Sequence, residues 1–444
     1  MDTVWHVMRG LLGIVAFVAL AVLLSENRRA IRWRLVVAGL ALQFVFAALV
    51  IYVGPVRAVV EWVGSRFVDL LGFTNEGAKF VFGSLADQQK HGVVFAIGIL
   101  PSIIFFSAVS SLLYYLGILQ KVVYGFAWVM SKTMKLSGAE SLSASANIFL
   151  GQTEAPFLIK PYLPTLTRSE VLCVMTGGMA TIAGAVMIAY ISFLGGADPV
   201  QQVMFATHLI TASVISAPAA ILTAKIICPQ VEPVNEDLSI PREQIGTNLL
   251  DAICLGTTDG LKLAVNVGAM LIVFTALVAL VNALLGWFGA PHTLTIGSQV
   301  WLNYPGLNGW VASVTGGTFQ TFSLEFLLGI LYAPLAWLIG IDYGDLMQSG
   351  SLLGTRTVLN EFVAYLYLGE AKASGVISNP RTVVILTYAL CGFANIVSIG
   401  IQVGGIGALA PTQRTTLVKL GVKAMLGGTI ACMLTACVAG ILVR

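Results

Sequence analysis

Charged side chains are scarce in this sequence. Asp, Glu, Lys and Arg make up 10% of its 444 residues, whereas 57% are hydrophobic. A soluble globular protein carries roughly 25% charged residues, because its surface faces water. The deficit excludes an ordinary soluble protein and indicates a surface that mostly faces hydrocarbon. The net charge of +3, without a long basic run, also gives no reason to expect nucleic acid as a partner.

Metal ligands and catalytic motifs are sparse as well. The six cysteines include no CxxC pair and mostly lie in apolar segments, so neither a disulfide framework nor a zinc site is predicted. The four histidines are scattered, and no HExxH or GxxxxGK motif occurs. We therefore expect no cofactor and no enzymatic activity.

The sequence does contain long apolar runs. A helix that crosses a bilayer needs about 20 apolar residues. We interpret eight runs as the transmembrane helices of an all-α polytopic membrane protein, and the four arginines after the first run place that connection in the cytoplasm. The runs are 10–24, 35–53, 93–118, 171–194, 201–225, 261–287, 382–407 and 420–443.

Two other segments are too polar to cross the bilayer and too apolar for ordinary loops. Residues 138–165 and 344–368 are rich in Gly, Ser, Thr and Asn, and each has an acidic residue near its middle. Irregular backbone at membrane depth must be buried in protein or line a wet cavity, so we predict two re-entrant hairpins. The segments before them, 119–136 and 322–341, are predicted to be interfacial helices.

The same order of segments occurs twice. One extra crossing, 261–287, separates the two units and would turn the second over relative to the first, which predicts inverted repeats. Such transporters bind substrate near the midplane, beside discontinuous helices. We therefore divide the chain into scaffold helices with an interfacial helix (1–118), transport repeat 1 with hairpin 1 (119–225), a cytoplasmic loop, scaffold helix and external loop (226–321), and transport repeat 2 with hairpin 2 (322–444).

The middle of each hairpin carries candidate binding residues. Gln152, Thr153 and Glu154 are consecutive polar residues in the first, and Glu361 follows Asn360 in the second. A glutamate among apolar neighbours costs several kcal/mol unless it is paired or solvated by a cavity. The alternative for Glu154 is a hairpin tip in water, but the recurrence at equivalent places favours one central site.

Two predicted crossings contain residues that favour a break in the helix. Asn395 and Ser398 are three residues apart and share one helix face, and Gly177, Gly178 and Gly184 surround Thr181. A break would free carbonyl oxygens that, with the Thr181 hydroxyl, suit a hard cation. The alternative in both places is close packing of helices through small and polar residues.

The hairpin and crossing motifs resemble those of the concentrative nucleoside transporters over nearly the whole chain. The resemblance implies eight transmembrane helices, two oppositely oriented hairpins and a homotrimer with one transport path per protomer. The motifs that carry it are GQTEAP at 151–156, NEFVAY at 360–365 and CGFAN at 391–395, supported by NEGAKFVFG at 75–83, ILPSIIFFSA at 99–108, NVGAML at 266–271 and APLAWLIG at 333–340.

The resemblance also implies roles for individual residues. Gln152, Thr153 and Glu154 would meet the nucleobase, while Glu361, Asn395 and Ser398 would hydrogen-bond the ribose. Leu263, Val186 and Phe393 would line apolar walls. The sodium position maps to Asn147, Leu150, Thr181 and Ile182, largely through backbone carbonyls.

We therefore expect a nucleoside importer driven by cation symport. Sodium is the preferred coupling ion, although protons remain possible because a buried carboxylate can carry one. A transporter of another polar solute is the main alternative, whereas an intramembrane enzyme would need an acidic metal cluster or a nucleophile–base pair. The compact chain suggests a multi-pass protein of the bacterial cytoplasmic (inner) membrane, with lipid and the nucleoside as its partners.

Overall fold

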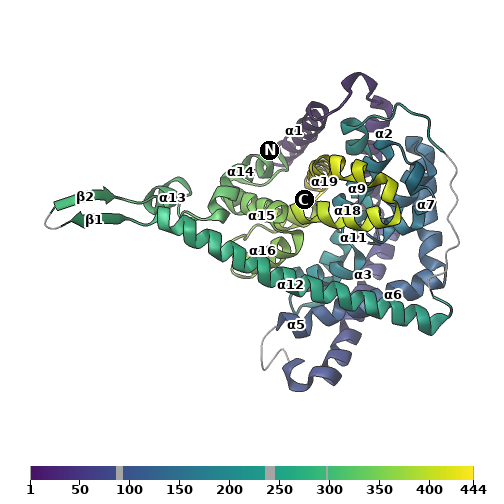
Figure 1. Cartoon of the computed structure of the whole chain (residues 1–444), viewed down its shortest axis with the longest axis horizontal. Helices are drawn as coiled ribbons and strands as arrows, with labels where there is room; N and C mark the ends of the chain where they lie inside the picture. The colour runs from purple at the N-terminus through teal and green to yellow at the C-terminus, as the bar shows by residue number, and fades with distance from the viewer. Residues whose placement is uncertain (1, 87–93, 236–245, 297–298, 444) are drawn as a thin grey trace.

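The computed structural model describes residues 2–86, 94–235, 246–296 and 299–443, and helices dominate it (Figure 1). Residue 93 of the predicted run 93–118, residues 236–245 of the predicted cytoplasmic loop and residues 297–298 of the external loop lie outside the described residues. The first five labelled helices are α1 (Asp2–Leu23), α2 (Trp33–Tyr52), α3 (Gly54–Phe82), α5 (Phe95–Gly98) and α6 (Leu100–Tyr115).

Helices long and apolar enough to span a membrane confirm a polytopic membrane protein. The described residues hold seven of them, where we predicted eight crossings. The predicted run 382–407 accounts for the difference, because the structure divides it between α17 (Pro380–Ala389) and α18 (Ile396–Leu409). The amphipathic α3 lies within residues 1–118, for which we predicted an interfacial helix.

The first repeat begins with α7 (Ile118–Met134) and α8 (Gly138–Ala146). Ser137 starts α8 with a capping box: its hydroxyl accepts from the Glu140 N–H, and the Glu140 carboxylate accepts from the Ser137 N–H. Short 3-10 turns follow, and the repeat then continues with α9 (Arg168–Ala180), α10 (Gly184–Gly195) and α11 (Pro199–Ile227).

The second repeat has the same order of elements. A helix is again followed by a predicted hairpin segment, a pair of short helices and a long helix. The predicted hairpin 2 forms two regular helices, whereas the predicted hairpin 1 forms one helix and 3-10 turns. Its elements are α14 (Leu324–Leu338), α15 (Leu346–Val358), α16 (Glu361–Ala373), α17, α18 and α19 (Arg414–Leu442).

Each repeat contains a broken helix, and the two breaks touch. α9 ends at Ala180 and α10 begins at Gly184, whereas residues 390–395 separate α17 from α18. The Phe393 N–H donates to the Thr181 carbonyl across 3.3 Å. Backbone groups released by one break therefore bond to the other, which avoids unpaired polar groups in the interior.

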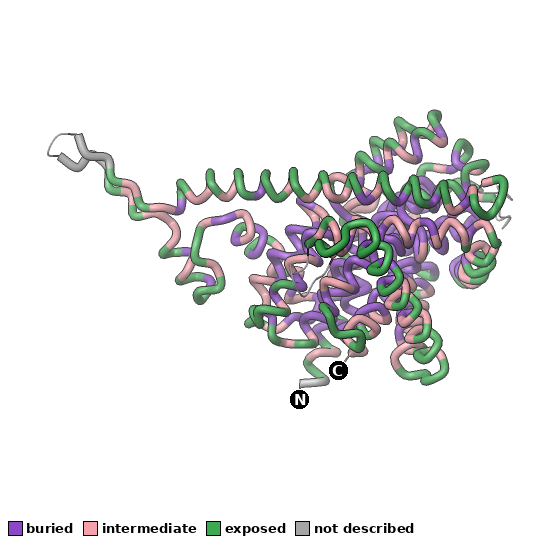
Figure 2. The backbone as a smooth tube through the Cα atoms, turned by 90° about the horizontal axis from the view of Figure 1, so that it is seen from below, coloured by how far each residue is buried: buried purple, intermediate pink, exposed green. Residues whose placement is uncertain are grey.

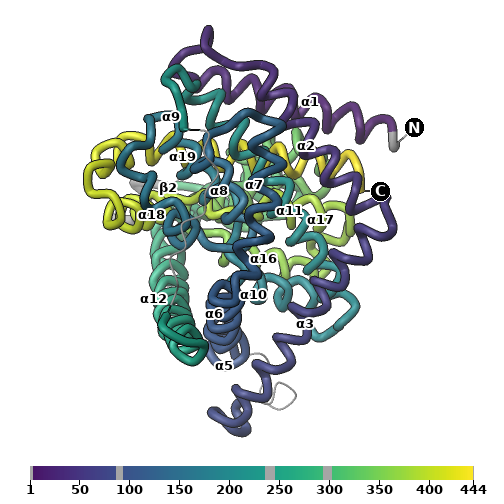
Figure 3. Tube along the Cα trace, turned by 90° about the vertical axis from the view of Figure 1, so that its right-hand side faces the viewer, coloured from purple at the N-terminus to yellow at the C-terminus, as the bar shows by residue number. Residues whose placement is uncertain are grey.

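Between the repeats lies one long helix, α12 (Leu249–Gly289). It packs along α6 (Figure 3). It also extends well beyond the body of the molecule, where β1 (His292–Ile296) and β2 (Gln299–Tyr304) form an antiparallel hairpin (Figure 1). A short helix, α13 (Asn308–Val314), precedes α14. The predicted external loop 288–321 therefore contains two strands and a helix.

Burial separates the two kinds of region. In Figure 2 the body is mostly buried, whereas α12 is mostly exposed along its length. All residues in the most apolar stretch of the broken helix 168–195 are buried. In the most apolar stretch of α12, 11% of the residues are buried. The breaks, and the polar residues beside them, therefore lie in the core of the protein.

Candidate binding site at the two helix breaks

Hairpin 1 brings Gln152 into the core beside α18. The Gln152 amide nitrogen donates to the Ser398 hydroxyl across 3.1 Å, and the Gln402 amide nitrogen donates to the Gln152 oxygen across 3.1 Å. Gln402 also donates to the Met175 carbonyl of α9. Gly178 permits this approach, because a Cβ there would lie 2.6 Å from the Gln402 amide nitrogen.

Hairpin 2 delivers Glu361 to the same region. Asn360 caps α16 by accepting from the Val363 N–H, so Glu361 stands in the first turn, where the helix dipole favours a negative charge. The Glu361 side chain is 5% exposed. Its carboxylate accepts from the Tyr190 hydroxyl at 2.9 Å and from the Asn395 amide at 3.1 Å.

Asn395 joins the two hairpins. It is the N-cap of α18, and its side-chain oxygen accepts from the Ser398 N–H at 2.9 Å while its amide donates to Glu361. The break before α18 therefore places the Asn395 side chain between Ser398 and Glu361. A continuous network runs from Gln152 through Ser398 and Asn395 to Glu361.

Among the described residues, the other predicted site residues are not hydrogen-bonded into this network. Val186 is buried on α10, Phe393 is half-buried in the second break, and Leu263 is half-buried on α12. Thr153 lies against α18, since a Cβ on Gly405 would be 3.1 Å from its methyl group. Glu154 is exposed and accepts from the Gly151 N–H at 3.0 Å.

The predicted cation position holds buried polar atoms without a partner. Asn147 is 1% exposed, and neither its amide oxygen nor its amide nitrogen has a hydrogen-bond partner in the described part of the chain. Its nitrogen would lie 3.3 Å from a Cβ on Gly177, in the last turn of α9. Thr181 ends that helix, and its hydroxyl donates to the Gly177 carbonyl.

These residues suit a small hard cation. An unsatisfied buried amide costs about 1–3 kcal/mol, and a cation that the amide oxygen coordinates would satisfy that oxygen. Leu150 and Ile182 are buried and have apolar side chains, so only their backbone oxygens could serve as ligands. Among the described residues no cluster of three His, Cys, Asp or Glu could hold a metal. The oxygen-only set resembles sites for ions such as sodium rather than transition metals.

Sequence reasoning missed two members of the network. Gln402 is four residues after Ser398, and Tyr190 is four residues after Val186, so helical spacing places each on the face of a predicted site residue. Tyr190 also stacks on Tyr365, with ring centroids 4.3 Å apart. The same spacing argument, applied one turn further along each helix, would have found both.

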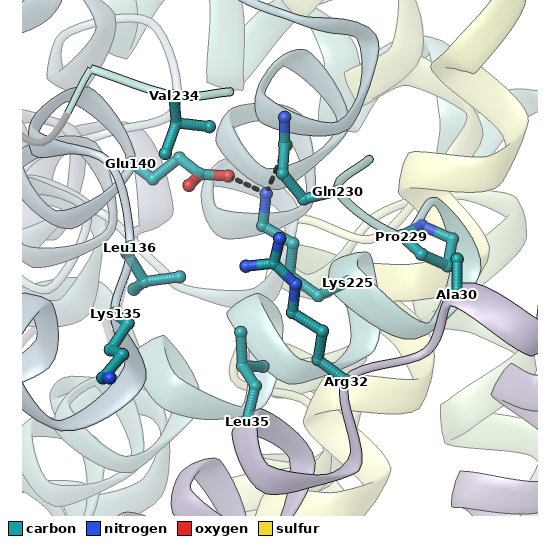
Figure 4. Close-up of a pocket in the computed structure, with 10 residues that line it drawn as sticks. All are labelled: Ala30, Arg32, Leu35, Lys135, Leu136, Glu140, Lys225, Pro229, Gln230 and Val234. Atoms are coloured by element: carbon teal, nitrogen blue, oxygen red, sulfur yellow. Dashed lines mark hydrogen bonds and ion pairs between the residues drawn. The ribbon is translucent and has the colours of Figure 1, made fainter. Parts of the chain in front are cut away.

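Two cavities lie away from this network. A small one is lined by Arg32, Lys135 and the buried ion pair of Lys225 with Glu140, whose lysine also donates to Gln230 at 3.0 Å (Figure 4). A larger one, of about 1000 Å³, has mostly apolar walls between α2, α3 and α11 and contains His208 bonded to Tyr388. The broken helices, rather than either cavity, concentrate the polar groups that match a hydroxyl-rich ligand.

Models of known protein families match the chain in three consecutive parts. The model described as Na+ dependent nucleoside transporter N-terminus matches residues 12–85, and the one described as nucleoside recognition matches residues 96–197. The Na+ dependent nucleoside transporter C-terminus matches residues 208–440, which is more than half of the chain.

Similar whole proteins give the same result. An uncharacterized transporter of Haemophilus influenzae is 39% identical and aligns over 98% of each chain. The sodium/nucleoside cotransporter 2 of Rattus norvegicus is 38% identical over 97% of this chain, which spans 62% of that longer protein. The structure of CNTnw in an inward-facing substrate-bound state matches with a TM-score of 0.85, 34% identity and 99% coverage of each chain. An outward-facing state of CNTnw matches with a TM-score of 0.86 at 33% identity.

Proposed function

The chain belongs to the concentrative nucleoside transporter family, and we propose that it imports nucleosides into a bacterial cell by sodium symport. The family consists of transporters rather than enzymes, and its solved members include inward- and outward-facing states, as alternating access requires. The observation that carries the proposal is the buried network from Gln152 to Glu361, which connects the two hairpins through Ser398 and Asn395 at the start of α18.

The network's chemistry supports a ligand with hydroxyl groups at one end. Glu361 offers carboxylate oxygens, and Asn395 and Ser398 add donors and acceptors beside it, so we assign the ribose to these three residues. Gln152, Thr153 and Glu154 then face the nucleobase. Val186, Leu263 and Phe393 form the apolar walls around base and sugar.

The ribose assignment makes a direct prediction about substrate choice. A site built to pair a hydroxyl rejects an analogue without it, because the buried partner loses its hydrogen bond. We expect deoxynucleosides to compete with uridine or adenosine uptake at least roughly tenfold less well. Equal inhibition by ribo- and deoxynucleosides in a competition assay would contradict the assignment.

Sodium coupling is supported by the unpartnered amide of Asn147 beside Thr181. An ion held there by Asn147, Thr181 and the backbone oxygens of Leu150 and Ile182 would order hairpin 1 and hold Gln152 toward α18. Nucleoside affinity and sodium affinity must then rise by the same factor, because coupling between sites is reciprocal.

Proton symport is the second candidate. Glu361 is buried and its hydrogen-bond partners in the described part of the chain, Tyr190 and Asn395, are uncharged, so its carboxylate is able to carry a proton. Uptake into proteoliposomes under separate sodium and proton gradients distinguishes the two. Accumulation under a sodium gradient alone supports sodium symport, and accumulation under a proton gradient alone supports the alternative.

The substrate panel in the same assay tests the wider proposal. Nucleosides should be accumulated, whereas free bases, free ribose and amino acids should not. Accumulation of another polar solute in preference to nucleosides would reassign the transporter.

The exposed apolar face of α12 supports our proposal that several copies of the chain assemble in the bacterial cytoplasmic membrane. Large apolar side chains such as Ile272, Leu284 and Trp287 are exposed on this helix, so lipid or another protomer covers them. We propose a homotrimer in which residues 1–118 and 226–321 form the scaffold. The units 119–225 and 322–444 then form the transport repeats, with their hairpins entering the membrane from opposite sides.

A further inference from the structure

An arginine lies buried deep in the second repeat. Arg356, near the end of α15, is 1% exposed and heads the largest fully buried side chains among the described residues. A cation at this depth is costly unless other groups compensate it, and such residues in membrane proteins mark functional places. None of the sequence motifs or proposed substrate contacts accounts for it.

The guanidinium contacts the end of a broken helix. Its Nη1 donates to the carbonyl of Ala389, the last residue of α17, across 2.6 Å. The C-terminal end of a helix carries unpaired carbonyls and a partial negative charge, so a cation is favoured there. The Tyr365 hydroxyl donates to the nearby Thr387 carbonyl across 2.6 Å. Hairpin 2 therefore supplies donors to the carbonyls at this break.

Glu361 is not the direct partner of Arg356. The described residues include no ion pair between them within 4.0 Å, and the hydrogen-bonded partners of the Glu361 side chain are Tyr190 and Asn395. The Arg356 Nε has no hydrogen-bond partner in the described part of the chain. Glu361 therefore interacts with the arginine only through its electric field, and the carbonyl end of α17 is the direct hydrogen-bond partner.

The first repeat shows what stands at the equivalent position. The same number of residues separates Asn147 from Thr181, the C-cap of α9, as separates Arg356 from Leu390, the C-cap of α17. Asn147 and Arg356 stand near the C-terminal ends of α8 and α15, the first helix of each hairpin. They also approach the last turns of α9 and α17, the helices that precede the two breaks. The hairpin tips differ slightly, because Glu154 follows Asn147 by two more residues than Glu361 follows Arg356.

The two positions differ in charge. At the first break the amide of Asn147 is unpartnered, as a site for an incoming cation requires, whereas at the second break the chain supplies a cation of its own. We propose that the Arg356 guanidinium is a built-in cation at the second break, in place of the sodium ion at the first. This pair of breaks therefore takes up one sodium ion per nucleoside. The inference rests on the proposed sodium symport.

The test measures the sodium dependence of nucleoside binding to the purified protein. Wild type should bind nucleoside with a Hill coefficient for sodium of about one. Arg356→Lys keeps a cation and should keep that coefficient, with the sodium requirement changed less than roughly threefold. Arg356→Asn introduces the residue of the first repeat, and it should bind nucleoside only at higher sodium, with a coefficient that rises toward two.

A matched control and a rescue separate charge from folding. Arg381 also donates to carbonyls, those of Gly340 and Gly440, but lies at the start of α17 away from the break. Arg381→Gln should leave the Hill coefficient unchanged. For Arg356→Asn, guanidinium ion at millimolar concentration should restore nucleoside binding at low sodium, which a merely misfolded variant would not show.

The possible results test the role of Arg356 and the proposed sodium symport separately. A wild-type coefficient of two, unchanged sodium dependence in Arg356→Asn, or equal damage in Arg356→Lys and Arg356→Asn overturns the role of Arg356. Should Arg356→Asn fail to fold, the wild-type coefficient and Arg356→Lys still decide the question. If wild type binds nucleoside without any need for sodium, the proposed sodium symport fails instead.

Discussion

The broken helix 168–195 and the continuous helix α12 are both apolar enough to cross a membrane, yet they have opposite surroundings. In their most apolar stretches, all residues of the first are buried, whereas 11% of the residues of the second are buried. Hydropathy does not separate them, and a continuous helix can have either setting, because 94% of the residues in the most apolar stretch of α11 are buried. The broken helix places polar backbone and side chains inside the protein, and the continuous helix turns large apolar side chains outward.

The difference reflects where unpaired polar groups are tolerated. A break frees backbone groups that lipid cannot satisfy, so it must be enclosed by protein or line a cavity. The second break meets this need through the bond from Phe393 to Thr181 and the bond from Arg356 to Ala389. A continuous helix satisfies its own backbone and needs no such cover. We therefore expect substitutions near the breaks to affect transport, and substitutions on the outer face of α12 to affect it little.

The largest expected effect comes from Glu361→Gln beside the second break. An amide removes the charge and offers one oxygen in place of the two that accept from Tyr190 and Asn395. Losing such a buried, charged acceptor costs on the order of 3 kcal/mol, so nucleoside uptake should fall at least roughly a hundredfold. Uptake into proteoliposomes, with oligomer size checked by gel filtration, measures it.

Glu370 provides the control for that substitution. It stands on the same helix, α16, but is exposed. Glu370→Gln should retain uptake close to wild type. Normal transport by Glu361→Gln would show that the second break is not part of the binding site.

Asn147→Ala tests the first break and should have the next largest effect. Removing the unpartnered amide takes a ligand from the proposed sodium position, so the sodium concentration for half-maximal uptake should rise roughly tenfold. Ser143→Ala is the control, because the Ser143 hydroxyl on α8 is also buried and has no hydrogen-bond partner among the described residues. An equal change in both variants would point to packing instead of ion binding.

Stability should distinguish the two helices directly. Ile188 on α10 is fully buried, whereas Ile272 on α12 is 75% exposed. Ile188→Ala should lower the free energy of unfolding by about 2–5 kcal/mol, because it leaves a cavity in the core. Ile272→Ala should cost about 0.5 kcal/mol or less in the detergent-solubilised protein. Chemical unfolding of both variants measures the difference, and equal losses would show that the α12 face is enclosed.

The smallest expected effect lies in the connection between α1 and α2. Glu26 accepts from Arg168 at 2.7 Å and from Lys423 at 2.6 Å, and these bonds, led by that of Arg168, lower its pKa from 4.5 to about 2. Because the folded-state pKa is depressed, this stabilisation is present above about pH 4.5 and is lost as the pH falls toward 2.

Glu26→Gln should therefore lower the melting temperature slightly at pH 7, and the deficit should shrink as the pH falls below 4.5. The exposed pair of Glu76 and Lys79 on α3 is the control, since Glu76→Gln should change the melting temperature still less. A deficit for Glu26→Gln that is constant from pH 7 to pH 3 would show that its ion pairs do not contribute.

Much of this architecture could be predicted from the sequence, because hydropathy and composition are local signals. The apolar runs located the helices long enough to cross a membrane, although the long helix α3 has no such run. The glycine- and serine-rich segments coincide with α8 and the turns after it, and with α15 and α16. The ends of α12 were less accessible, since residues 249–260 include Asp251 and Asp259 and do not look apolar although they are helical. Hydropathy also could not reveal that residues 390–395 divide a predicted crossing, although Asn395 and Ser398 indicated the place.

The site was predictable where two signals coincided. Glu361, Asn395 and Ser398 combine polarity with apolar surroundings, and the structure joins them to Gln152. The ion pair of Lys225 with Glu140 had no such signal, because its two residues are distant in the chain and only the packing of α8 against α11 brings them together. Arg356 did carry a signal, as a cation within a predicted buried hairpin, but its partner is a backbone carbonyl that no sequence pattern marks.

The most direct test of the account is nucleoside binding to the purified wild-type protein in sodium chloride and in choline chloride. Isothermal titration calorimetry should show a lower Kd for nucleoside in sodium, and a lower Kd for sodium in saturating nucleoside, by the same factor. A tenfold change corresponds to about 1.4 kcal/mol of coupling free energy. Equal nucleoside Kd values in the two salts would contradict a sodium-coupled site at the helix breaks.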